Sequence, residues 1–419
     1  MSVAHLAGFV AIRRAGDEGA EEAGRRFRGR TLRLRFASAV VLLLASAAVA
    51  PGSDAESGPL TQSRLLEQQL THYRQLATDV AAAPAQIVPT IHPGDALDAA
   101  PRLARWLIAL GDLAAGVPVP TAYTGELVEA VQRFQARHGL VQDGVIGVAT
   151  ATALAVPAAA RVRQIELTLA RLRQLPPLES GRAVLVNVPA FELEAFDEVE
   201  AGPPPVLRMS VVVGHAFRTE TPFFTAAMRT VVFAPYWHVP RSITRKEMLP
   251  KLRGDPEYLA AQDMEIVADG SVLAPTTDAI ARLAEGRAEL RQRPGPLNAL
   301  GHVKFLFPNA YHVYMHDTPA RGLFRRTRRD FSHGCIRLAD APALARWVLG
   351  GEGWDAGRVD GMLEVAGQTS VPLRHPIPVV IGYATAVARA DGTISFYEDV
   401  YGRDAALERT STDGSRYLR

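Results

Sequence analysis

The first half of the chain is patterned for helices. Apolar residues recur about every three to four positions over roughly residues 60–83, 97–157 and 161–175, with polar residues between them, which is typical of amphipathic helices. His138-Gly139 ends one of these stretches, because glycine readily adopts the left-handed conformation found at helix C-termini. The pattern therefore predicts a small domain of short helices.

The second half of the chain changes to the pattern of strands. Runs rich in β-branched and aromatic residues, punctuated by proline, predict strands at 183–189, 191–196, 209–214, 230–233, 304–315, 371–384 and 392–397. Charged and apolar residues at helical spacing predict a helical insertion within 255–293. Asp340 is a suitable N-cap for a helix over 340–349, with Pro342 in its first turn. The fold class predicted is α+β and multidomain, with a helical domain followed by a mostly-β domain.

Changes in pattern divide the chain into six segments. An N-terminal extension with a signal or anchor segment covers 1–50, and a linker with a helix covers 51–96. The helical domain covers 97–157, a connecting helix 158–182, the mostly-β domain 183–385, and a C-terminal strand and tail 386–419. No internal repeat is visible, so a solenoid or propeller is not expected.

The N-terminal segment is typical of an exported protein. Six arginines lie between Arg25 and Arg35, and residues 36–50 are apolar and end in small residues. A basic flank, a short apolar core and small residues are the layout of a secretory signal. The apolar run is shorter than the roughly 20 residues that a spanning helix needs. Export to the periplasm or cell envelope is predicted, with inner-membrane association through 36–50 as the alternative.

Composition and charge limit the kinds of partner and reaction that the chain can have. The formal net charge is +2 at pH 7, and no clustered basic face or aromatic platform indicates a nucleic-acid partner. Cys335 is the single cysteine, so no disulfide forms within the chain. An unpaired thiol is exposed to oxidation in an exported protein, which favours a chemical role for it over an idle one.

Two short segments carry the residue types that thiol chemistry needs. In the first, His312, Tyr314 and His316 alternate with Tyr311, Val313 and Met315 toward the end of the predicted strand, so His312, Tyr314 and His316 share one face. The second reads Ser332-His333-Gly334-Cys335-Ile336-Arg337. A thiol attacks as the thiolate, which a nearby imidazole or positive charge favours. Backbone N–H groups at a Gly-Cys turn are natural donors to the oxyanion that forms on a carbonyl.

Other interpretations of these residues were weighed. His302, His312, His316, His333 and Cys335 could serve as metal ligands, but their spacing matches none of the common zinc patterns, and no metal is expected. A papain-like site needs a cysteine far upstream of its histidine, whereas His316 precedes Cys335 closely. A buried, unreactive thiol remains the structural alternative.

The helical domain and the segments around His316 and Cys335 each resemble a known protein family. Ala130 to Gln135, His138 to Leu140 and Asp143 to Thr150 resemble the three-helix peptidoglycan-binding domain of cell-wall enzymes. His316 followed by Ser332 to Arg337 resembles the signature of the L,D-transpeptidase (YkuD-type) catalytic domain. Leu300 to Phe305, Phe307 to Asn309 and Pro235 to Pro240 are similar to its larger periplasmic, YcbB-like branch, although Ala234 stands where that branch commonly has Asn.

The second resemblance implies roles for ten residues. Cys335 would be the nucleophile and His316 the general base, oriented by the backbone carbonyl of Asp317. His333 and Gly334 would support the oxyanion region. The residues that would line the substrate channel are Tyr236, Trp237, Tyr314, Ser332 and Arg337.

The same resemblance implies the reaction. Cys335 would attack the peptide bond before the terminal D-alanine of a stem tetrapeptide. The amine of a second stem would then resolve the thioester and form a 3→3 cross-link, with no cofactor. Water, a free D-amino acid or a lipoprotein amine are alternative acceptors, and a non-catalytic wall-binding scaffold is the alternative class. The partners expected are peptidoglycan stem peptides and glycan.

Overall fold

The computed structural model describes residues 59–79, 87–88, 90–116, 120, 122–176, 178, 181–199, 205–255, 257–389 and 391–412. Every described residue belongs to the unit that spans residues 51–419. The predicted signal or anchor segment at 36–50 lies outside the described residues.

The helices expected in the first half are present. They are α1 (Pro59–Thr78), α2 (Ala100–Ala109), α3 (Glu126–Arg137), α4 (Val148–Leu154) and α5 (Ala158–Leu172). Trp106 of α2 and Phe134 of α3 are buried in one apolar core. Gly139 follows the end of α3 with φ +66°, so the helix stops where the sequence predicted.

A hairpin from the far end of the chain completes this helical core. It consists of β14 (Ala386–Ala388) and β15 (Ile394–Phe396), and it is followed by α12 (Arg403–Thr412). Gln62 Nε2 of α1 donates to Ala388 O at 2.7 Å, and the Phe396 ring lies 5.3 Å from the Tyr73 ring. Strands β14 and β15, which lie where the sequence pattern assigned a C-terminal strand and tail, therefore pack with the helices.

A buried ion pair ties α3 to the hairpin. Arg137 Nε donates to Asp112 Oδ1 at 2.7 Å, and Arg137 Nη1 donates to Ile394 O at 2.6 Å. The two side chains are 6% and 2% exposed. Ion pairs removed from water in this way lose much stability when one partner is deleted, so this pair holds the helical core and the hairpin together.

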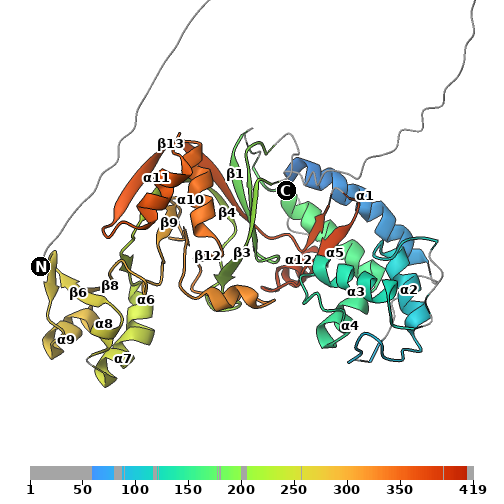
Figure 1. Ribbon diagram of the computed structural model, residues 1–419, viewed down its shortest axis with the longest axis horizontal. Helices are drawn as coiled ribbons and strands as arrows, with labels where there is room; N and C mark the ends of the chain where they lie inside the picture. The colour runs from blue at the N-terminus through green and yellow to red at the C-terminus, as the bar shows by residue number, and fades with distance from the viewer. Residues whose placement is uncertain are drawn as a thin grey trace, which may run out of the picture. The chain divides into compact units, whose positions relative to one another are not determined.

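The mostly-β domain is built on a sheet that closes on itself (Figure 1). Its strands are β1 (Ala183–Asn187), β2 (Glu192–Phe196), β3 (Leu207–Gly214), β4 (Phe224–Phe233), β9 (Val303–Leu306), β10 (Met315–His316), β11 (Asp330–Ser332), β12 (Ile336–Leu338) and β13 (Thr369–Gly382). The order is β11-β3-β12-β10-β9-β4-β13-β1-β2, and β2 also pairs with β3. Alternate side chains such as Val186, Val231, Phe305 and Met315 are buried in a common core, as the period-two pattern predicts.

Helices α10 (Ala341–Gly350) and α11 (Ala356–Leu363) contribute to the same core and lie together beside β9 and β13 (Figure 1). Asp340 accepts a hydrogen bond from Ala343 N at 2.9 Å, so the predicted N-cap is confirmed. A 3-10 helix, η3 (Arg321–Arg325), lies between β10 and β11.

The insertion contains more than the predicted helices. It comprises β5 (Trp237–His238), α6 (Arg241–Ile243), η2 (Thr244–Met248), α7 (Leu249–Gly254), α8 (Tyr258–Ala261), β6 (Met264–Ala268), β7 (Ser271–Leu273), α9 (Thr277–Glu285) and β8 (Glu289–Gln292). Its strands form a separate sheet in the order β5-β8-β6-β7. Strands of two to five residues are too short for a period-two alternation of apolar and polar residues to be recognised. The charged side chains of Glu289 and Arg291 in β8 favoured the helical interpretation.

The strand predicted over 304–315 is interrupted. Strand β9 ends at Leu306, and β10 contains only Met315 and His316. Asn309 organises the turn between them, since its Oδ1 accepts from Tyr311 N at 3.0 Å and its Nδ2 donates to Val313 O at 2.7 Å. His312 is exposed in this turn, with φ +56°. The alternation that placed His312 on the face of His316 therefore does not hold.

Candidate active site

Three neighbouring strands place a lysine, a histidine and an arginine side by side. His316 of β10 pairs with Lys304 of β9 and with Arg337 of β12. The preceding residue, Met315, pairs with Phe305 and Ile336, and all three are buried in the core. Because side chains alternate along a strand, Lys304, His316 and Arg337 project from the opposite, outer face.

Cys335 joins this face immediately before β12. Ile336 N donates to Tyr314 O at 3.1 Å, which sets Cys335 beside Tyr314, and the two side chains are hydrogen-bonded. Burial raises the pKa of the Cys335 thiol, and the Tyr314 hydrogen bonds and the charges of Arg337 and Lys304 oppose this rise. The thiol is therefore the resting form at neutral pH. Among the described residues, Cys335 makes no hydrogen bond to His316.

His316 is held as a neutral imidazole. Its Nδ1 lies 2.5 Å from Asp317 O, and the residue is 5% exposed. Burial, followed by the nearby charge of Arg337, lowers the pKa of His316 to about 3. A carbonyl oxygen can only accept, so Nδ1 carries the hydrogen and Nε2 has the free lone pair. The ring is thus in the tautomer that can receive a proton at Nε2.

The Asp317 side chain is fixed by groups on three sides. Its Oδ2 accepts from His302 N at 3.0 Å, and its Oδ1 accepts from Arg321 Nη2 at 2.6 Å. A Cβ at Gly301 would lie 2.2 Å from Asp317 Oδ2, so glycine is required at that position. Since the carbonyl of the same residue orients His316, the packing of this carboxylate positions the imidazole.

The loop that carries the thiol is locked by hydroxyl groups. Ser332 Oγ accepts from Gly334 N at 3.1 Å and donates to Cys335 O at 2.5 Å. Thr221 Oγ1 donates to Gly334 O at 2.9 Å, and Gly334 has φ +111°. The Ser332 side chain is thus engaged with the loop backbone. Sequence reasoning assigned no role to Thr221, because only the fold brings it to this loop.

His333 points toward the insertion. Its Nε2 lies 2.7 Å from Glu247 Oε1 in the short π-helix η2, and both side chains are partly exposed. Glu247 is the polar partner that the described residues provide for this imidazole. The sequence placed His333 at the oxyanion region; in the structure its side chain joins the loop that carries Cys335 to the insertion.

Tyr236 and Trp237, two of the three aromatic residues predicted to line the channel, have different surroundings. Tyr236 O lies 3.5 Å from Lys304 Nζ, and the Arg291 guanidinium lies 4.5 Å from the Tyr236 ring. Trp237 packs against the apolar core of the insertion. Tyr236 therefore adjoins the face of Lys304 through its backbone, while Trp237 helps to attach the insertion.

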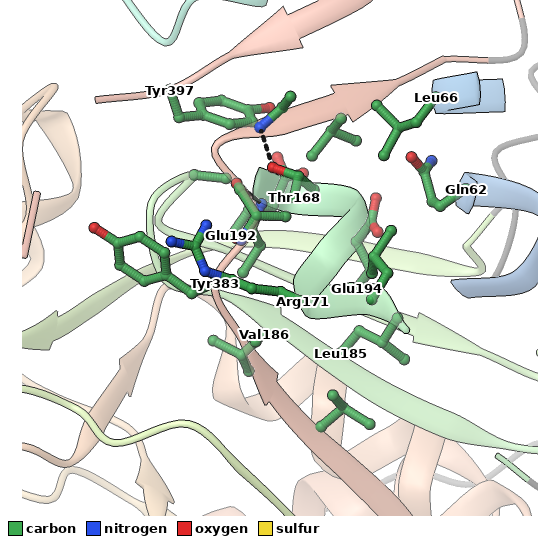
Figure 2. Close-up of a pocket in the computed structure, with 18 of the residues that line it drawn as sticks. Gln62, Leu66, Thr168, Arg171, Leu185, Val186, Glu192, Glu194, Tyr383 and Tyr397 are labelled. Atoms are coloured by element: carbon green, nitrogen blue, oxygen red, sulfur yellow. Dashed lines mark hydrogen bonds between the residues drawn. The ribbon is translucent and has the colours of Figure 1, made fainter. Parts of the chain in front are cut away.

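A pocket lies on other strands of the closed sheet (Figure 2), and Cys335 is not among the residues that line it. Leu185 and Val186 of β1, Glu192 and Glu194 of β2, and Thr168 and Arg171 of α5 are among its lining residues. Neither cysteine nor histidine lines it. Because Cys335 precedes β12, this pocket is not the predicted catalytic centre.

Two searches of the described residues found no membrane or metal feature. No helix in this part of the chain is both long and apolar enough to cross a membrane. The same residues contain no group of three or more His, Cys, Asp or Glu arranged to hold a metal ion.

Comparison with known families identifies the two regions. Residues 181–381 match the family described as "L,D-transpeptidase catalytic domain". They form an L,D-transpeptidase catalytic domain. Residues 99–154 match "Putative peptidoglycan binding domain", so the transpeptidase domain follows a peptidoglycan-binding domain in the chain. The predicted fold class and family resemblance are thereby confirmed at the level of the two domains.

A curated protein of Haemophilus influenzae, named "Putative L,D-transpeptidase", is 32% identical over 249 residues. The match covers 58% of this chain and 49% of that protein, so the chain spans about half the length of the curated relative.

Two solved L,D-transpeptidases are more distant. The one from Stackebrandtia nassauensis is 12% identical, covering 72% of this chain and 98% of that one, with a TM-score of 0.27. The one from Mycobacterium smegmatis is also 12% identical, covering 48% and 59%, with a TM-score of 0.22. These scores are too low for any detail of the site to be transferred.

Proposed function

We propose that this chain is a cysteine-dependent L,D-transpeptidase that cross-links peptidoglycan. The observation that carries the proposal is the arrangement of Cys335, Tyr314 and the neutral, oriented His316 on one face of the transpeptidase domain. Nucleophile and base on adjacent strands are the parts that thiol acyl transfer needs. Membership of the YcbB-like branch remains a prediction.

In the first half of the reaction, Cys335 gives its proton to Nε2 of His316 and the sulfur attacks the carbonyl before the terminal D-alanine. The N–H groups of Gly334 and Cys335 are proposed to stabilise the resulting oxyanion, for which Gly334 N must exchange the hydrogen bond that it donates to Ser332 Oγ here, with His333 nearby. The C–N bond then breaks, the imidazolium protonates the leaving amine, and a thioester remains. The sulfur and Nε2 need to come into contact only when the substrate is bound.

In the second half, the side-chain amine of an acceptor stem attacks the thioester. Its proton passes to His316 and then to the departing sulfur, so the enzyme is regenerated and a 3→3 cross-link forms. Tyr236, Trp237, Tyr314, Ser332 and Arg337 are proposed to line the substrate channel. The Ser332 side chain is bonded to the loop backbone and the Trp237 side chain packs against the core of the insertion. The support for a channel role of these two residues is therefore only that they are close in sequence to Cys335 and Tyr236.

The peptidoglycan-binding domain at 99–154 supports an action on the assembled wall. We therefore propose that the protein works in the periplasm or cell envelope and that residues 36–50 direct its export. Whether that segment also anchors the protein would be tested by fractionating cells that express the full chain.

Mass spectrometry of muropeptides tests the proposal. Purified protein and a Cys335→Ala variant are incubated with disaccharide tetrapeptide. Dimers that lack one D-alanine, formed by the wild type alone, would support transpeptidation through Cys335. Tripeptide monomers alone would identify water as the acceptor. An unchanged substrate with both proteins would contradict the proposal and favour a lipoprotein-tethering enzyme or a scaffold.

A further inference from the structure

Lys304 and Arg337 are two cations on the face of the thiol. No acidic side chain among the described residues forms an ion pair with either, and Arg337 Nε is buried without a hydrogen-bond partner. The only polar contact of Lys304 Nζ within this part of the chain is the long one, 3.5 Å, to Tyr236 O. Burial lowers the pKa of both groups, which is the cost of holding a cation away from water.

Other buried arginines in this chain are compensated. Arg137 pairs with Asp112, and Arg171 lies 2.5 Å from Asp404. Arg329 has no carboxylate partner in the part of the chain that the structure describes, but it donates to the carbonyl oxygens of Val211 and Arg326. Lys304 and Arg337, which flank His316, are half-buried cations with no carboxylate partner among the described residues, and Lys304 has only the long contact to Tyr236 O. This is unusual, because charges held away from water are normally paired. Their position on the face of the thiol indicates that the missing anion comes with the substrate.

We propose that Lys304 and Arg337 bind the free α-carboxylate of the terminal residue of the donor stem. This inference rests on the proposed function, in which that residue is the leaving group. Its amine and its carboxylate are attached to the same carbon atom. A carboxylate held between Lys304 and Arg337 would therefore place the leaving nitrogen next to His316, the group that must protonate it.

The geometry of the sheet fits this ligand. Adjacent strands are about 4.8 Å apart, so the backbones of Lys304 and Arg337 are separated by about 10 Å with His316 midway. Both side chains are long enough to reach a small anion above the imidazole. Arg337 lies two residues beyond Cys335, about 6.6 Å along a strand, which leaves room for the scissile carbonyl at the sulfur.

The two cations could instead serve the thiolate alone, since both interact electrostatically with Cys335. The two roles make different predictions. If the two cations only stabilised the thiolate, removing one of them would weaken the reaction with every donor equally. Binding the carboxylate would affect only donors that carry one at the terminal residue. A donor ending in a carboxamide, otherwise identical, separates the roles.

Binding is measured by calorimetry with the full chain carrying Cys335→Ala, so that no turnover occurs. The ligands are a stem tetrapeptide with a free C-terminal carboxylate and the same peptide as its carboxamide. A charge-assisted contact predicts that the acid binds about 10- to 100-fold more tightly than the amide. Lys304→Met in the same background should reduce this preference to less than about threefold, and Lys304→Arg should restore most of it.

Lys251→Met is the matched control. Lys304 Nζ lies 5.8 Å from the centre of the Tyr314 ring, and Lys251 Nζ lies 5.3 Å from the centre of the Tyr258 ring, but in the insertion. It should leave the preference unchanged. Equal affinity for acid and amide, or a preference that persists in Lys304→Met, would overturn the inference. Turnover of the acid donor by the unmodified protein is measured in parallel. Its absence would refute the proposed function, while the binding ratio would still decide the role of Lys304.

Discussion

Glu247 Oε1 lies 2.7 Å from His333 Nε2 and connects the insertion to the loop that carries Cys335. Glu247 belongs to the π-helix η2, a conformation often found at functional positions. The exposed fractions of the two side chains are 42% and 46%. Solvent screens such a pair, so its contribution is below about 1 kcal/mol.

Weakening this contact should make the thiol easier to reach. In Glu247→Ala, we expect Cys335 to react with a thiol-directed reagent about two- to fivefold faster, which corresponds to less than about 1 kcal/mol. Salt should produce a similar increase in the unmodified protein and none in the variant. Glu257→Ala, an exposed change elsewhere in the insertion, is the control. A labelling rate unaffected by Glu247→Ala would mean that the pair does not limit access.

The low pKa of His316 predicts how stability depends on pH. The unfolded imidazole takes up a proton near its ordinary value of 6.5, whereas the folded one does so only at about 3. The unfolded state thus binds more protons between these values, and stability falls as pH decreases through this window. The slope from this group approaches about 1.4 kcal/mol per pH unit. Urea unfolding from pH 7 to 4 should show a shallower decline for His316→Gln.

Any side chain at position 334 should destabilise the fold. Its φ of +111° is strained for any L-residue, although a Cβ there would meet no atom closer than 3.7 Å. Gly334→Ala should therefore destabilise the fold by about 1–2 kcal/mol and slow labelling of Cys335 by displacing the loop. Gly361→Ala in α11, where nothing lies within 4 Å, should be neutral or stabilising. Similar effects of the two changes would exclude backbone conformation as the cause.

Breaking the buried pair of Arg137 and Asp112 should strongly destabilise the fold. Arg137→Met leaves Asp112 buried without its partner and removes the bond to Ile394 O, so we expect a loss of about 3–5 kcal/mol in the free energy of unfolding. The exposed pair of Arg74 with Glu166 provides the comparison, and Arg74→Met should cost less than about 1 kcal/mol. Urea denaturation measures both. Equal losses would show that burial does not determine the strength of these pairs.

Local chemistry made part of this structure predictable. Helix ends at Gly139 and Asp340 depend on neighbouring residues only, so the sequence located both. Strand β8 was missed because four residues with alternating charge are too few for a period to appear. The interrupted strand before Met315 was missed because the side chain of Asn309, rather than a propensity, organises the turn.

The residues of the candidate site divide in the same way, into those that the sequence indicates and those that only the fold brings together. Cys335 and His316 stand in short segments whose residue types indicate thiol chemistry by themselves. Lys304 carries no such signal, and its position beside His316 depends on the pairing of β9 with β10. Thr221 reaches the loop of Gly334 from 113 residues away. Contacts of this kind become visible only when the strand order is known.

The helical core has a consequence for biosynthesis. Gln62 near the start of α1 binds Ala388 O, 326 residues later, and Phe396 packs on Tyr73. A domain folds as a unit once all of its parts are present. The hairpin of β14 and β15 supplies Ala386, Ala388, Ile394 and Phe396 to the core of the helices, so that core is complete only after the C-terminal strands have been made. The helices at 99–154 therefore reach their final packing no earlier than the sheet that carries the thiol.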